Sequence, residues 1–141
     1  MLPVLALALA ADPSPAVSPS PVVSEATAPR YRIAAGKGTA TLLLNATTGS
    51  PEASLGLLTL DAGAEVAPHV HAESVEILYL EAGSVEVVVA GLTLTARAGD
   101  AVRIPAGVEH SARVTTTMRA LQVYVAAGPE QRFTAGERVN P

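Results

Sequence analysis

The chain has 141 residues, and 49% of them are hydrophobic, which is enough apolar material for the core of one domain. It contains no cysteine, so disulfides and thiolate metal ligands are excluded. Its net charge is -4 and its nine Lys and Arg residues form no run, so it lacks the basic surface that nucleic acids require and no nucleic-acid partner is expected.

The first predicted element is an apolar run over residues 1–11. It ends in Ala-Leu-Ala-Ala, and such small residues are typical of the cleavage site of a secretory signal. The run is too short to span a bilayer, so no transmembrane segment is predicted. No Lys or Arg precedes Arg30, and the basic region that usually begins a signal is therefore missing. We expect an exported protein, periplasmic or secreted, and the alternative is an apolar tail on a cytoplasmic protein.

Residues 12–29 form the next segment, which is rich in proline and serine. Positions 11–29 contain five Pro and four Ser, a composition that favours extended chain over packed core. We therefore expect a disordered N-terminal extension that links the signal to a folded domain.

Residues 30–128 are expected to fold as one all-β domain. The segments are short and rich in Val, Leu and Thr, and Gly, Pro or Asp separates them. The predicted strands are 31–35, 39–45, 53–60, 66–71, 75–81, 84–90, 92–96, 101–104, 109–116 and 118–126. The clearest hairpin joins 85–89 to 92–95 across Ala90-Gly91. Because parallel strands need helical crossovers, which the pattern lacks, we expect a small antiparallel sandwich or barrel.

Residues 129–141 form a polar C-terminal tail. We expect it to contain one short helical turn that packs Phe133 against the domain.

The chain has three histidines, and two of them lie two positions apart in the stretch PHVHAESVE. On a strand, His69 and His71 would face the same side. Glu76 follows after a short connection, and a tight turn would bring its carboxylate back beside the two imidazoles. His110 could join them from a later strand. Three imidazoles and one carboxylate suit one divalent ion of Mn, Fe, Ni, Cu, Co or Zn and leave coordination positions for water or a substrate.

A histidine pair on an amphipathic strand can also be a surface feature without a metal. Here the candidate ligands lie within a frame of turn residues. These are Gly63, Gly83, Gly99, Pro105 and Gly107. The frame favours the metal site over the surface alternative.

Two segments resemble the motifs of the cupin superfamily. Residues 63–83, GAEVAPHVHAESVEILYLEAG, fit the first motif, G-x5-H-x-H-x4-E-x6-G. Residues 99–114, GDAVRIPAGVEHSARV, fit the second motif, G-x5-P-x-G-x2-H-x3-N, except that Val114 replaces the final Asn. The Asn is not a metal ligand, so its loss affects a supporting hydrogen bond. The resemblance covers roughly residues 50–128 and is typical of a small single-domain cupin.

The resemblance implies a small antiparallel jelly-roll barrel with its site in the barrel mouth. It also implies that the four metal ligands are His69, His71, Glu76 and His110. Glu73 is the competing carboxylate, and the resemblance places it in a solvated turn instead. A homodimer is expected from the resemblance alone.

The pocket lining is expected to be aliphatic. Continuing the alternation from Glu76 turns Leu78 and Leu80 inward. The residues that could add polarity or sulfur to this lining are Tyr79, Met118, Gln122 and Tyr124, and for Gln122 and Tyr124 the pattern leaves pocket and outer surface equally open. Little inward charge argues against small dicarboxylates as substrates.

The reaction itself is left open by the sequence, because a fold does not specify a function. One reading is a metal-dependent oxygenase, isomerase or lyase that binds a small oxygen-bearing molecule. The alternatives are a non-catalytic module that binds a metal and a small molecule, and a metal that only stabilises the barrel.

Overall fold

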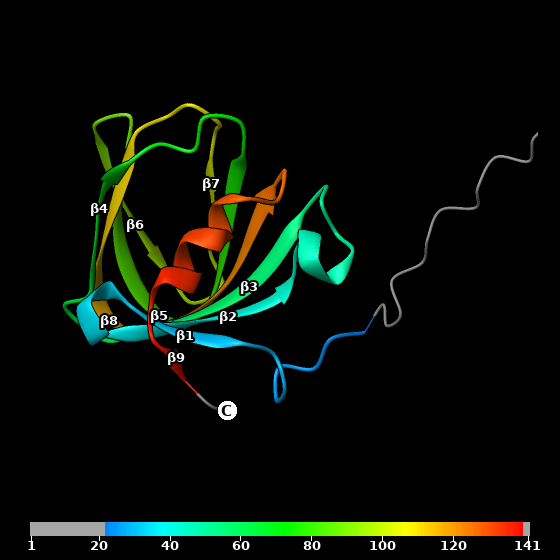
Figure 1. Ribbon diagram of the computed structural model, residues 1–141. Helices are drawn as coiled ribbons and strands as arrows, with labels where there is room; N and C mark the ends of the chain where they lie inside the picture. Colours follow the sequence, from blue (N-terminus) through cyan, green and yellow to red (C-terminus); the bar gives the residue numbers. More distant parts are fainter. Residues whose placement is uncertain (1–21, 140–141) are drawn as a thin grey trace, which may run out of the picture.

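In the computed structural model, residues 22–139 are described, and they form a β-barrel (Figure 1). The signal expected at 1–11 and positions 12–21 of the linker lie outside the described residues. The strands are β1 (Arg30–Ile33), β2 (Gly38–Leu44), β3 (Ser54–Leu60), β4 (Glu65–His69), β5 (Val75–Val89), β6 (Leu92–Arg97), β7 (Ala101–Ile104), β8 (His110–Val125) and β9 (Arg138–Val139). Three short 3-10 helices accompany them: η1 (Ala34–Gly36), η2 (Ala46–Thr48) and η3 (Pro129–Ala135).

All strand pairs of the described chain are antiparallel, so the expected all-β jelly-roll class is confirmed. The strand order is β6-β5-β8-β3-β2-β1-β9, with β4 added to β8 and β7 added to β5. β5 and β8 therefore take part in both halves of the barrel. Figure 1 shows the strands curled around a common interior.

β5 and β8 are each one long strand where the sequence pattern predicted two. The predicted strands 75–81 and 84–90 merge into β5, and 109–116 and 118–126 merge into β8. The register between them shifts repeatedly from Leu80 to Val85. Gly83 lies at this bend with φ +80°, a conformation that a residue with a Cβ rarely adopts. The glycine thus bends the strand without ending it.

The predicted hairpin is confirmed. Val89 pairs with Leu92, and Ala90 and Gly91 between them both have positive φ. Two such residues form the tight turn whose twist matches antiparallel strands.

The interior is aliphatic, as the low aromatic content predicted. Its fully buried side chains include Leu80, Val85, Val87 and Ile104. Val114, which replaces the motif Asn, is 2% exposed and belongs to this core. At this position the core needs no side-chain hydrogen bond.

Residues 22–29 of the expected linker lie against the barrel. Ala28 is buried, and Glu25 forms an ion pair with Arg119 of β8 at 2.9 Å. The backbone N–H groups of Thr27 and Ala28 donate to the carbonyl of Ser24, which closes a turn. This part of the segment enters β1 as a packed connection.

The C-terminal tail returns to the barrel. η3 is the predicted helical turn, and Phe133 is buried as expected. β9 was not predicted, and its two residues pair with Arg30 and Tyr31 of β1. A two-residue strand has too little pattern to be recognised in a sequence.

Candidate metal centre

The four predicted ligands converge at one end of the barrel interior. His69, His71, Glu76 and His110 each offer a ligand atom, and these atoms lie within 4.8 Å of one another. His69 ends β4 and His110 begins β8, and the two residues pair directly across the sheet. Glu76 is the second residue of β5. Antiparallel register therefore unites residues that are far apart in the chain.

His71 lies outside the strand in which it was predicted. The expected strand 66–71 ends at His69, because the chain turns inward beyond it. The N–H of Gly107 donates to the carbonyl of His71 at 2.8 Å and ties this turn to the loop before β8. His71 is buried, and its Nε2 lies 3.2 Å from Nε2 of His69.

Backbone carbonyls orient two of the imidazoles. Nδ1 of His69 lies 2.8 Å from the carbonyl of Ala67, and Nδ1 of His110 lies 2.9 Å from the carbonyl of Val108. A carbonyl only accepts, so in each ring Nδ1 carries the donated hydrogen. The Nε2 lone pair of the neutral ring then faces the centre of the site, which is the arrangement of metal-binding histidines.

The donor spacing fits a single small ion. Oε2 of Glu76 lies 3.2 Å from Nε2 of His71 and 3.1 Å from Nε2 of His110. Two donors at right angles, each about 2.1 Å from an ion, are separated by about 3 Å. Lone pairs that face one another at this distance repel unless a proton or a metal cation lies between them. The geometry and the donor types therefore both fit a divalent transition metal.

Glu76 is held as an ionised carboxylate. It is 4% exposed, and its Oε1 accepts a hydrogen bond from Nε2 of Gln122 at 2.6 Å. Burial by itself raises the pKa of Glu76, but hydrogen bonds from His110 and Gln122 outweigh it, and the net shift of the pKa is downward. The site thus contains one negative charge that favours a cation.

The same environment shifts the pKa values of the histidines. Burial lowers the pKa of His69 and lowers the pKa of His71 to about 4, because a charged imidazole is poorly solvated there. The hydrogen bond to Glu76 instead raises the pKa of His110. His71 is therefore a neutral ligand at pH 7.

Glu73 lies apart from the site. Its side chain is exposed, as the resemblance implied, whereas Glu76 is buried among the histidines. A step of two residues would have placed Glu73 beside His71 only if the strand had continued. The turn separates the two glutamates.

Gln122 and Tyr124, which the sequence left between pocket and surface, face the interior. Both are buried. Nε2 of Gln122 also donates to the hydroxyl of Tyr124 at 2.9 Å, and the Tyr124 ring lies edge-on to His71 with 5.0 Å between centroids. Burial raises the pKa of Tyr124 strongly, so the phenol stays protonated. Tyr79 is exposed and takes no part.

A cavity of about 50 Å³ within the barrel is lined by His69, Glu76 and His110, three of the four candidate ligands. Leu78 lines it, as the alternation predicted, together with Val85 and Val87, whereas Leu80 is buried in the core and does not line the cavity. Arg132 of η3 also lines it and was missed by the sequence analysis. The position of Arg132 depends on how the C-terminal tail folds back onto the barrel, and no periodic pattern in the sequence predicts that path.

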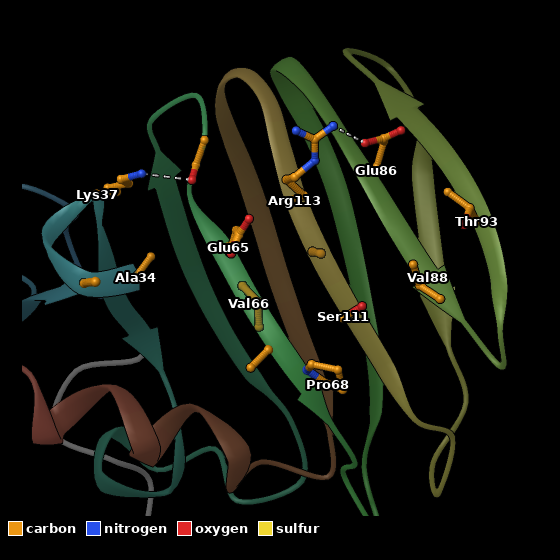
Figure 2. A pocket seen from close by; sticks show the side chains of 14 residues that line it. Ala34, Lys37, Glu65, Val66, Pro68, Glu86, Val88, Thr93, Ser111 and Arg113 are labelled. Carbon is orange, nitrogen blue, oxygen red and sulfur yellow. Dashed lines mark hydrogen bonds and ion pairs between the residues drawn. The ribbon is translucent and has the colours of Figure 1, made fainter.

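A larger groove of about 830 Å³ lies on the outer side of β4, β5 and β8 (Figure 2). Three of its charged groups are engaged with one another or with the backbone: Arg113 pairs with Glu86, and Lys37 donates to the carbonyl of Gly63. None of the four candidate ligands lines it. The candidate chemistry therefore belongs to the interior.

Comparisons with solved structures identify the same barrel elsewhere. A predicted oxalate decarboxylase from Thermotoga maritima matches with a TM-score of 0.66 and 24% identity, over 74% of this chain and 98% of that chain. An RmlC-like cupin from Shewanella frigidimarina matches with a TM-score of 0.60 and 25% identity, over 68% of this chain and 82% of that chain.

A putative ethanolamine utilization protein from Salmonella typhimurium matches with a TM-score of 0.57 and 28% identity, over 64% of this chain and 71% of that chain. These likenesses establish the barrel fold and assign no reaction. No curated protein gives a significant match. The family model of the cupin domain matches residues 56–126, which is half of the chain and contains all four candidate ligands. This chain belongs to the cupin family.

Proposed function

We propose that His69, His71, Glu76 and His110 hold one divalent transition-metal ion, beside which the barrel binds a small oxygen-bearing molecule. The observation that carries this proposal is the convergence of all four ligand atoms within 4.8 Å, with the Nε2 atoms of His69 and His110 turned inward by backbone carbonyls. Such pre-orientation lowers the cost of assembling a metal site.

When bound, the ion supplies Lewis acidity toward an oxygen atom of the small molecule. The chain's own residues do the rest. Glu76 offsets part of the positive charge, and Gln122 fixes the orientation of its carboxylate. Tyr124 offers a protonated hydroxyl beside this pair. The aliphatic walls exclude water from the space next to the site.

Titration with Co²⁺ tests the proposal, because Co²⁺ takes the same ligands as the other candidate ions and absorbs visible light. We expect saturation at one equivalent per chain, with bands typical of nitrogen and oxygen ligands. Adding a small oxygen donor should then shift these bands. Saturation without any such shift would favour a metal that only stabilises the barrel.

The reaction class that we propose is oxidation, isomerisation or elimination on a small substrate. An oxygen-uptake screen with the as-purified protein separates the first from the others. Substrate-dependent uptake with bound iron or copper would favour an oxygenase. A screen with no turnover of any substrate would favour a non-catalytic binding module.

A further inference from the structure

One positive charge faces the same cavity as three of the four candidate ligands. Arg132 of η3 lines this cavity together with His69, Glu76 and His110. The Nη2 of Arg132 donates to the hydroxyl of Tyr124 at 3.3 Å, and its guanidinium carbon lies 4.9 Å from the centroid of the Phe133 ring. Because Arg132 is also exposed, the guanidinium is held at the boundary between cavity and solvent.

Within residues 22–139, Arg132 forms no ion pair with a carboxylate, whereas Arg113 and Arg119 each pair with glutamates. Tyr124 engages one of the five N–H donors of the guanidinium, and the others have no hydrogen-bond partner in that part of the chain. A ligand between Arg132 and the metal site would therefore be favoured if it were an anion.

Most of the remaining lining of the cavity is apolar, and its other polar residues, Ser111 and Gln122, carry no charge. Aliphatic side chains line it: Leu58, Leu60, Leu78, Val85, Val87, Ile104, Val114 and Met118. Among the described residues that line it, Arg132 is the sole Lys or Arg. A second negative charge placed deeper would be buried without a partner, at a high cost in free energy. The volume of about 50 Å³ limits the apolar part of the ligand to a few carbon atoms.

We infer that Arg132 recognises the carboxylate of the ligand, and that the ligand class is small aliphatic monocarboxylates whose carbon chain enters the barrel. This inference rests on the proposed function, since the same carboxylate lies beside the metal. It also corrects the expectation that little charge faces the pocket, because Arg132 reaches the cavity from the tail. In this role Arg132 is a specificity-determining residue.

Isothermal titration calorimetry on the full-length, Zn²⁺-loaded protein tests this inference with 2-methylpropanoate, acetate and the neutral amide 2-methylpropanamide. We expect 2-methylpropanoate to bind about tenfold more tightly than acetate, because each buried methylene contributes about a factor of four. The amide should bind at least tenfold more weakly than its carboxylate. Equal affinities for the amide and the carboxylate would overturn the inference.

The variants separate Arg132 from the metal as the source of carboxylate preference. Arg132→Gln should weaken binding of 2-methylpropanoate at least tenfold and leave the affinity for the amide unchanged, and Arg132→Lys should restore part of the loss. Arg103→Gln is the control, because Arg103 is exposed on β7 and does not line the cavity. Wild-type affinity for 2-methylpropanoate in Arg132→Gln would contradict the inference.

The zinc content of each variant distinguishes the two proposals. Normal zinc loading without preference for the carboxylate would overturn the role of Arg132 and leave the metal site standing. A wild-type chain that takes up no zinc but binds 2-methylpropanoate through Arg132 would overturn the metal site and leave the role of Arg132 standing.

Discussion

Two glutamates three positions apart have opposite environments. Glu76 is buried, receives a hydrogen bond from Gln122 and faces His71 and His110. Glu73 is exposed in the turn before β5. The difference arises from where the strand begins, since Glu76 is within β5 and takes its inward direction from the pleat.

Glu76→Gln should lower the affinity of the protein for a divalent transition metal by at least tenfold, because it removes the negative charge of the site. Glu73→Gln is the matched control and should leave the affinity unchanged. Competition with a chelator of known affinity measures both. A larger effect from Glu73→Gln would transfer the ligand role to that residue.

At the scale of residues, the sequence predicted the candidate ligands because their spacing repeats a motif. It could not assign Gln122 and Tyr124, since alternation along a strand gives two faces and does not say which one is inside. The pairing of Glu76 with Tyr124 shows which face is inside, because the side chains of directly paired residues lie on the same face of a sheet. Arg132 lies in a tail whose path no pattern describes.

At the scale of elements, the bend in β5 gives the barrel its curvature, and Gly83 makes it possible. Gly83 and Gly91 have nearly the same φ, +80° and +79°. They differ in their surroundings: a Cβ at Gly83 would collide with the carbonyl oxygen of Thr117, whereas at Gly91 it would meet open space. Alanine substitutions at these two glycines therefore separate the cost of the left-handed backbone conformation from the cost of steric overlap.

Gly91→Ala should lower the free energy of unfolding by about 1–2 kcal/mol, which is the cost of the left-handed conformation. Gly83→Ala should cost at least about 2 kcal/mol more, because the backbone of β8 must also shift. Urea denaturation measures both. Equal losses would show that β8 gives way to the added methyl group at no cost.

The segment before β1 is attached to the barrel through charge. The hydrogen bond from Arg119 lowers the pKa of Glu25, and the coulombic attraction of Arg30 acts in the same direction. A carboxyl group whose pKa is lower in the folded state contributes stability above its unfolded value of about 4.5. This contribution is lost as the pH falls through the folded pKa, which lies below that value.

Glu25→Gln should therefore lower the melting temperature slightly at pH 7, by about 1–2 °C, and this difference from wild type should shrink as the pH falls below about 4.5. Glu52→Gln, at another exposed glutamate, is the control and should change the melting temperature at neither pH. Differential scanning calorimetry at pH 7 and pH 3.5 measures the shifts. A difference as large at pH 3.5 as at pH 7 would exclude the ion pair as its cause.

The sequence predicted that the segments at 75–90 and 109–126 are β-structure but divided each into two strands. The predicted ranges leave gaps at residues 82–83 and at Thr117. In the barrel these positions are where long strands bend and pass from one half of the sheet to the other. Local pattern does not distinguish a bend from an end.

At the scale of the whole molecule, the domain that folds includes residues before Arg30. Ala28 is buried, and the N–H of Leu42 donates to the carbonyl of Pro29. The composition of residues 12–29 predicted a segment that does not pack against the domain. Composition alone does not show that the last turn of such a segment contacts the barrel.

Two deletions test this boundary. Removing residues 1–21 should leave the melting temperature nearly unchanged, because the core residues from Ala28 to Phe133 are retained. Removing residues 1–29 should lower it by several degrees, since the burial of Ala28 and the ion pair of Glu25 are lost. Equal melting temperatures for the two shortened chains would place the boundary at residue 30.

The fold as a whole was predictable because two motifs fix both the turns and the ligands of one barrel. Gly63, Gly83, Gly99 and Gly107 of these motifs all have positive φ. The pairing of β9 with β1 and the approach of Arg132 to the cavity were not predictable, since they depend on tertiary contacts of the tail.

The metal content of the purified protein tests the central claim most directly. Elemental analysis should find close to one transition-metal ion per chain in the wild type. The double variant His69→Ala, His110→Ala removes two of the four ligands, and it should contain none while retaining the β-sheet circular dichroism of the wild type. A folded double variant that keeps its metal would contradict the assignment of the site.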